Sequence, residues 1–179
     1  TCPKCWRHSF ATLLQDAIRV VTRWLESGKE LNPLPGYPFS DHQRRVKKRV
    51  LKIQNARKDK QRKKAYGDLL LVAELVLRYA LGAIPVLKAY ESELIEEQWK
   101  ARLIAEKLEE VVCLFDRLIN QTERRVIRGE KVPAEEKLVS FFETHTDIIE
   151  KGDRETLFGH KLFLVGGGSI PGATSQLSP

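Results

Sequence analysis

The run 69–87, LLLVAELVLRYALGAIPVL, is the densely apolar part of the chain, and the rest is interpreted around it. It is the only candidate for a membrane span, but Glu74 and Arg78 interrupt it and Pro85 ends it before a clean span is reached. Residues 69–81 are therefore predicted to form a buried helix that Pro85 breaks or kinks. No contact with a membrane is expected.

Amphipathic helices are predicted on both sides of this run. Apolar residues recur at helical spacing over 10–26, and Gly28 is expected to end that helix before a turn-rich linker at 32–38. After the run, a second apolar stripe begins near Glu93 and is closed by Gly129. The residues assigned to this second stripe are Ile95, Trp99, Leu103, Leu108, Val111, Val112, Phe115, Leu118, Ile119 and Val126.

A strongly basic stretch lies between the linker and the apolar run. Residues 44–64 contain twelve Lys or Arg against the single acid Asp59, in a chain whose net charge is +7. Ser40 is predicted to be the N-cap of one long helix over about 41–66, which is built almost wholly of strong helix formers. Because its apolar stripe is thin, this helix is expected to pack weakly and to project from the body.

A positive excess confined to one segment suits phosphate backbones or acidic surfaces. No aromatic residue is interleaved before Tyr66, so contact with a duplex backbone fits better than base stacking. The alternative is a solvated helix without a partner. The predicted phosphate contacts, which would position a duplex rather than read its sequence, are Arg44, Arg45, Lys47, Lys48, Arg49, Lys52, Arg57, Lys58, Lys60, Arg62, Lys63 and Lys64.

The pattern changes to β-rich runs toward the C-terminus. Residues 137–142 and 156–165 are predicted to be strands that pair as a hairpin, and the stretch after Val165 lacks periodicity and is expected to be disordered. Because an isolated hairpin is marginal in water, the chain is expected to begin a sheet that it does not complete. The predicted fold class is mainly α, with long helices and a short C-terminal β-hairpin.

Composition is consistent with a cytoplasmic protein. At 179 residues and 42% hydrophobic, the chain can form one ordinary domain, or a core with an extended appendage. Three cysteines give no disulfide framework, and no secretory signal is visible. Because Met is absent altogether, the chain is expected to be a piece of something longer.

Two small groups of residues could have a metal or acid–base role. Cys2 and Cys5 with His8 resemble half of a zinc site, but no second cysteine pair follows, so a non-native leader is preferred. His145, Asp147 and His160 flank the predicted strands and could ligate a metal, although a structural His-Thr-Asp turn is the preferred interpretation. No metal is therefore assigned to these groups.

Two blocks of sequence resemble insertion-sequence transposases of the bacterial ISNCY group, which are DDE transposases. Residues 12–23, TLLQDAIRVVTR, look like the helix that follows their first catalytic strand. The stronger block comprises, in the same order as in those proteins, 121–126, 129–133, 136–140, 142–143, 145–149, 151–152 and 158–161. The similarity covers roughly 12–167, although Ser9-Phe10-Ala11 stands where relatives carry a Thr-Asp-Ser turn.

This resemblance implies an RNase H-like core in which three carboxylates hold two divalent metals, Mg²⁺ in the complete enzyme, for DNA cleavage and strand transfer. In relatives the first Asp lies upstream of the 12–23 block and the other two acids lie downstream of Gly159-His160. The chain is therefore expected to be a truncated interior fragment, with no catalytic residue, cofactor or metal of its own.

The expected organisation is a non-matching leader, 1–11, a helical insertion between catalytic strands, 12–132, a β-rich remnant of the core, 133–167, and a tail, 168–179. The expected partner is double-stranded DNA at transposon ends, and a homo-oligomer is possible. The alternative is a helical protein–protein interaction module without a nucleic-acid role, in which the long helices pair between subunits.

Overall fold

The computed structural model describes residues 3–31, 37–133, 136–138, 141, 147–149 and 157–159. For 3–9, 147–149 and 157–159 the description covers the backbone alone. The elements are α1 (Pro3–Leu31), α2 (Gln43–Asn55), α3 (Asp59–Lys88), α4 (Ile95–Thr122), a π-helical turn η1 (Glu123–Arg128), β1 (Asp147–Ile149) and β2 (Leu157–Gly159).

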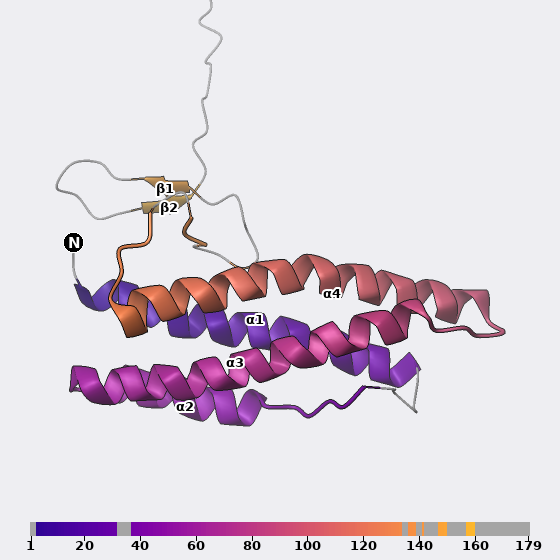
Figure 1. Cartoon of the computed structure of the whole chain (residues 1–179), viewed down its shortest axis with the longest axis horizontal. Coiled ribbons are helices and arrows are strands. Elements are labelled where there is room, and N and C mark those ends of the chain that lie inside the picture. The colour runs from indigo at the N-terminus through magenta and orange to yellow at the C-terminus, as the bar shows by residue number, and fades with distance from the viewer. Residues whose placement is uncertain are drawn as a thin grey trace, which may run out of the picture.

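The four α-helices lie side by side as an elongated bundle (Figure 1). α1 and α3 contact each other, and each of them also packs against both α2 and α4. α2 and α4 consequently lie on opposite sides of the bundle, at the bottom and top of Figure 1. Surfaces on these two helices therefore face in opposite directions.

α3 contacts the other three α-helices, and its predicted burial is confirmed for the side chains that face them, whereas Leu71 and Leu81 are exposed. Ten α3 side chains are buried, and Tyr66 and Leu69 are fully inaccessible. α3 is long and apolar enough to cross a membrane by length and composition. Pro85 does not break it, because the helix continues to Lys88 and Pro85 accepts a hydrogen bond from the Ala89 N–H at 3.0 Å.

The predicted single basic helix over 41–66 is wrong, because the chain forms a helical hairpin there. Ala56 has extended backbone (ψ 114°) and Lys58 is extended as well (ψ 138°), so α2 ends and α3 begins. The reversal buries Val46, Val50 and Ile53 of α2 against the bundle. An apolar stripe this thin can still be buried, since it lies at i, i+4 and i+7 on one face.

The ends of α1 and α2 also differ from the prediction. The side chain of Asp41, and not that of Ser40, accepts the hydrogen bond of the Gln43 N–H at 2.7 Å. Gly28 does not end α1, which continues to Leu31. Instead, Gly28 allows close packing, because a Cβ there would lie 2.8 Å from the Tyr37 hydroxyl.

The predicted C-terminal β-hairpin of 137–142 with 156–165, and with it the remnant of an RNase H-like core, is wrong. Lys137 and Leu138 have no strand structure, and Leu138 and Phe141 are buried with the helical core. The Gln121 side chain occupies one edge of the Leu138 backbone, because its Nε2 donates to the Leu138 carbonyl at 3.2 Å and its Oε1 accepts from the Leu138 N–H at 2.7 Å. This edge is therefore closed to a neighbouring strand.

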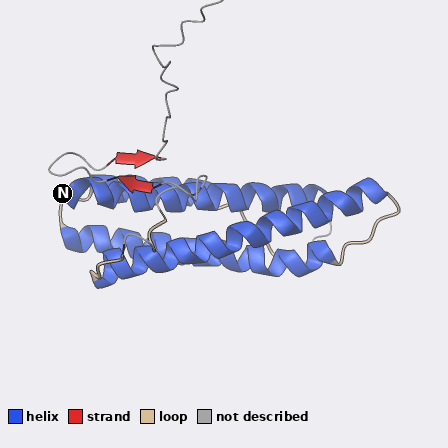
Figure 2. Cartoon of the chain, turned by 90° about the horizontal axis from the view of Figure 1, so that it is seen from above, coloured by secondary structure: helices blue, strands red, loops and turns tan. Residues whose placement is uncertain are grey.

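The only strand pairing in the described part of the chain is a three-residue antiparallel ladder between β1 and β2. Asp147 pairs with Gly159 and Ile149 pairs with Leu157. Figure 2 shows these two short arrows outside the four-helix bundle. Two strands of this length are too small to make a sheet core, so the described fold is a helical bundle.

Candidate nucleic-acid interface

The basic hairpin, defined here as residues 43–64, contains all twelve predicted phosphate contacts. It comprises α2, the extended turn 56–58 and the first turns of α3. Ten of the twelve cationic side chains are exposed, and Arg49 and Arg62 are partly buried. The fold therefore brings residues from both helices of the pair to the surface.

Three of the twelve cations hold the hairpin together. Arg49 donates from Nε to the Asp68 carbonyl at 3.1 Å, which ties α2 to α3. Arg62 donates to the Ala56 carbonyl at 2.8 Å, so it satisfies a backbone acceptor at the end of α2. Lys63 reaches a carbonyl of η1 at 3.4 Å. These contacts assign Arg49, Arg62 and Lys63 a structural role.

The remaining nine cations are available to a ligand, because within the described residues none of them donates a side-chain hydrogen bond or forms an ion pair. They are Arg44, Arg45, Lys47, Lys48, Lys52, Arg57, Lys58, Lys60 and Lys64. Asp59 is the single acid of the hairpin, and it lies 3.8 Å from Arg62. Nine cations without an acidic partner create a strong local positive potential.

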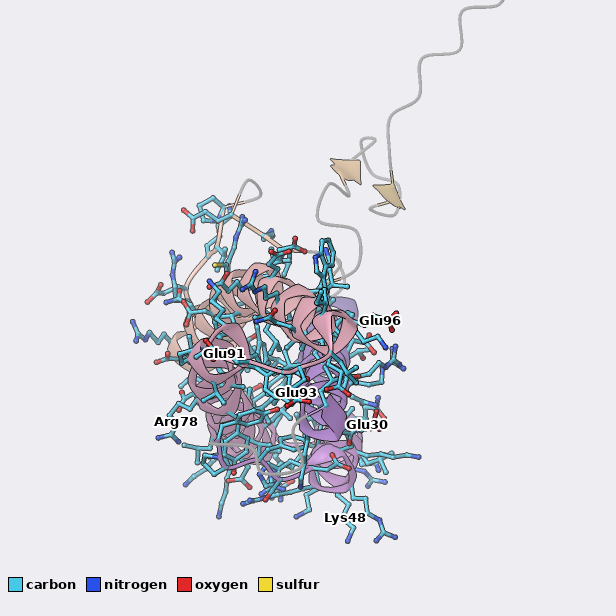
Figure 3. All side chains as sticks on the ribbon, turned by 90° about the vertical axis from the view of Figure 1, so that its right-hand side faces the viewer. Glu30, Lys48, Arg78, Glu91, Glu93 and Glu96 are labelled. Atoms are coloured by element: carbon cyan, nitrogen blue, oxygen red, sulfur yellow. The ribbon has the colours of Figure 1, made fainter. Side chains whose placement is uncertain are left out.

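The outer face of α2 carries a regular row of positive charge. Arg44, Lys48 and Lys52 follow one another at intervals of four residues, or about 6 Å along the helix axis. Figure 3 shows Lys48 pointing away from the bundle. A surface hollow beside the row is lined by Arg44, Arg45 and Lys48. An elongated anion can contact several members of this row at once.

Two arginines of η1 are paired with carboxylates, unlike the nine available cations of the hairpin. Arg124 binds Glu130 and Glu136, each at 2.9 Å, and these carboxylates raise the pKa of its guanidinium. Arg128 binds Glu123 at 2.9 Å. These arginines join the end of α4 to the following segment, and they add little to the potential of the hairpin.

The opposite end of the bundle is acidic. Figure 3 is viewed from that end and labels Glu30, Glu91, Glu93 and Glu96, all of which are exposed. The connection between α3 and α4 supplies Glu91 and Glu93, whereas the turn of the basic hairpin lies at the other end of α3 (Figure 1). Within the described residues, carboxylates are therefore more frequent at this end than in the hairpin, and this difference steers an anion toward the hairpin.

The other sequence candidates are not assembled into a site within the described residues. Among these residues no group of three His, Cys, Asp or Glu side chains could hold a metal ion. Cys2, His145 and His160 lie outside the described residues. Cys5 and His8 belong to α1, but their side chains are likewise outside the description. The two-metal arrangement that the resemblance implies does not fit the described side chains.

Sequence reasoning missed an exposed apolar row on α4. Ile95, Trp99 and Leu103 were assigned to the buried stripe, yet they lie on the surface with exposed fractions of 76%, 70% and 43%. The buried face at this level is formed instead by Ala101, Ile104 and neighbours at helical spacing. The period of 3.6 residues separates the two rows, because Ile104 is only one residue from Leu103 and points elsewhere.

No family model, characterised protein or solved structure matches this chain. Function is therefore inferred from the described side chains and from the resemblance of the two sequence blocks.

Proposed function

We propose that this chain binds double-stranded DNA through the basic hairpin, by contacts to phosphates. The observation that carries the proposal is the set of nine exposed cations with no partner among the described residues, against a single acid. Each phosphate contact releases condensed counterions, so binding is strongest at low salt. Such contacts position a duplex without reading its sequence.

DNA is favoured over other anions by the shape of the surface. α2 is 13 residues long, which corresponds to about 20 Å, and its row of cations is straight. A duplex presents one phosphate per about 1.7 Å of its axis, so a straight row of this length meets several of them. The resemblance to insertion-sequence transposases supports the same partner.

The proposed activity is DNA binding without strand transfer. In the family that the two blocks resemble, cleavage needs three carboxylates and Mg²⁺, and the resemblance matches none of these acids to a residue of the two blocks. Among the described residues, no group of three His, Cys, Asp or Glu side chains is placed to hold a metal ion. Incubation of purified protein with Mg²⁺ and supercoiled DNA is expected to give no nicking, and specific nicking would contradict this part of the proposal.

A salt titration of duplex binding tests the main proposal. The expected result is measurable affinity at low salt that falls steeply as salt rises. The alternative function, a helical interaction module without a nucleic-acid role, predicts no duplex affinity even at low salt. The exposed apolar side chains of α4 are the observation that favours this alternative, although the two functions are compatible in one molecule.

A further inference from the structure

The α4 ridge, defined as Leu94, Ile95, Trp99 and Leu103, consists of four exposed apolar side chains at the start of α4. Leu94 is 61% exposed and Trp99 is 70% exposed. Ile95, Trp99 and Leu103 are spaced by four residues, so they form one row along the helix. The row lies on the face of α4 opposite to the buried Ile104 and Leu108.

The extent of this surface matches that of a functional patch. An aromatic side chain offers about 150–250 Å², so the four partly exposed side chains of the ridge expose roughly 500 Å² of apolar surface. The largest apolar patch of a soluble monomer is typically about 300–600 Å² and is often functional. If two ridges cover each other, roughly 1,000 Å² becomes buried, which is the lower limit for a specific interface.

We propose that the α4 ridge is the contact between two copies of this chain, packed antiparallel about a two-fold axis at Trp99. The row is symmetric about this residue, because Ile95 and Leu103 lie four residues before and after it. In such a pair Trp99 meets its counterpart, and Ile95 of each copy lies opposite Leu103 of the other. The same patch on both copies is then buried, as in an isologous interface.

Charge on the flanks of the ridge favours this arrangement. Glu96 and Lys100 lie on the same flank and are exposed, and within the described residues neither forms an ion pair. An antiparallel two-fold pair brings like flanks together, so Glu96 of one copy lies about 3 Å along the axis from Lys100 of the other, twice. The two Lys100 side chains lie at the same offset from each other, so two attractive pairs stand against one repulsive pair. A parallel pair would instead place Lys100 at the same offset from Arg102 of the other copy. Like charges would then face each other, which disfavours the parallel form.

The proposed dimer goes beyond DNA binding and does not depend on it. α2 lies on the side of the bundle opposite to α4, so self-association through the ridge leaves both basic hairpins exposed (Figure 1). A variant that loses dimerisation should therefore still bind a duplex, whereas a variant that loses the hairpin charges should still dimerise. Failure of one proposal is distinguishable from failure of the other.

Sedimentation equilibrium tests the dimer over protein concentrations from about 1 µM to about 1 mM. The average mass is expected to rise from 20.5 kDa toward twice that value. Trp99→Glu and Trp99→Ala should abolish the rise, and the control Leu81→Glu, at an exposed leucine on α3, should not. Circular dichroism melting checks that each variant is folded. A mass that stays at 20.5 kDa over the whole range, or equal effects of Trp99→Glu and Leu81→Glu, would overturn the proposal.

Orientation is tested by charge exchange and by cross-linking. Glu96→Lys and Lys100→Glu should each weaken the dimer, and the double variant should restore it. With the native cysteines replaced by Ser, a short thiol cross-linker should join Ile95→Cys to Leu103→Cys in a mixture of the two proteins. Linkage of Ile95→Cys mainly to itself would contradict the antiparallel arrangement.

Discussion

Replacement of the outer row of α2 by neutral residues should lower the salt dependence of DNA binding by a predictable amount. The perturbation is Arg44→Gln, Lys48→Gln and Lys52→Gln, made together. These side chains are exposed and form no ion pair within the described residues, so their replacement should leave the stability of the bundle nearly unchanged. Any loss of DNA binding then reflects lost contacts between these three side chains and the phosphates.

The magnitude follows from the number of cations that one straight duplex can reach. Arg45 and Lys47 lie on opposite flanks of the outer row, so one straight duplex does not reach all nine available cations, and the magnitude is worked for about six contacts. Six phosphate contacts give a slope of log K against log salt of about −5.4, and removal of three contacts leaves about −2.7. Between 50 and 200 mM salt, the wild type should lose affinity by roughly 2,000-fold and the triple variant by roughly 40-fold.

Fluorescence anisotropy of a labelled duplex over a series of salt concentrations measures both slopes. The matched control is Arg23→Gln, Lys29→Gln and Arg78→Gln, which removes three exposed cations outside the hairpin. Its slope should equal that of the wild type, although its net charge is the same as that of the hairpin variant. Equal slopes for the two triple variants would refute the reasoning, because binding would then respond to net charge alone.

Further predictions concern the stability of the bundle and use thermal or denaturant unfolding. Gly28→Ala should lower the free energy of unfolding by about 1–3 kcal/mol, because its Cβ would lie 2.8 Å from the Tyr37 hydroxyl. Gly82→Ala, where the Cβ meets open space, should raise the free energy of unfolding by about 0.5–1 kcal/mol. Equal effects of the two substitutions would contradict the packing described. Gln121→Ala should lower the free energy of unfolding by about 2–4 kcal/mol and speed amide exchange at Leu138, because the buried N–H and carbonyl of Leu138 lose their partners. Unchanged amide exchange at Leu138 would contradict the two hydrogen bonds from Gln121. Burial raises the pKa of Tyr37 above 10.0. The stability that the neutral Tyr37 hydroxyl contributes is therefore complete below pH 10.0 and is lost as pH rises through the folded-state pKa. Tyr37→Phe should remove this part of the alkaline dependence of stability, and an unchanged pH profile would contradict a role of Tyr37.

The sequence predicted those parts of the fold that depend on neighbouring residues and missed those that depend on contacts with distant helices. The apolar run of α3 was correctly assigned to the core, because its density leaves few alternatives. The hairpin at 56–58 was missed, since this turn contains neither Gly nor Pro and the reversal is stabilised by burial of Val46 and Val50. Burial against a distant helix leaves no signal in the residues of the turn itself.

The C-terminal error has a similar origin. Leu138 and Phe141 lie in a run rich in β-forming residues, yet both are buried against the helical core. The decisive interaction is the side chain of Gln121, a residue 17 positions earlier that satisfies the Leu138 backbone as a neighbouring strand would. Strand propensity carries no information about such a partner.

The candidate interface was predictable in composition but not in detail. Counting charges identified all twelve cations of the hairpin as candidates. It could not separate Arg49 and Arg62, which hold backbone carbonyls, from Lys48, which points away from the bundle. That distinction depends on tertiary contacts, and it determines which substitutions should affect binding without affecting stability.

Lysine footprinting with and without duplex DNA at low salt tests the central claim most directly. If the basic hairpin contacts phosphates, the duplex should protect Lys48, Lys52 and Lys60 from acetylation and leave Lys29 and Lys88 as reactive as in the free protein. Uniform protection, or protection confined to lysines outside 43–64, would contradict the claim that this hairpin is the DNA-binding surface.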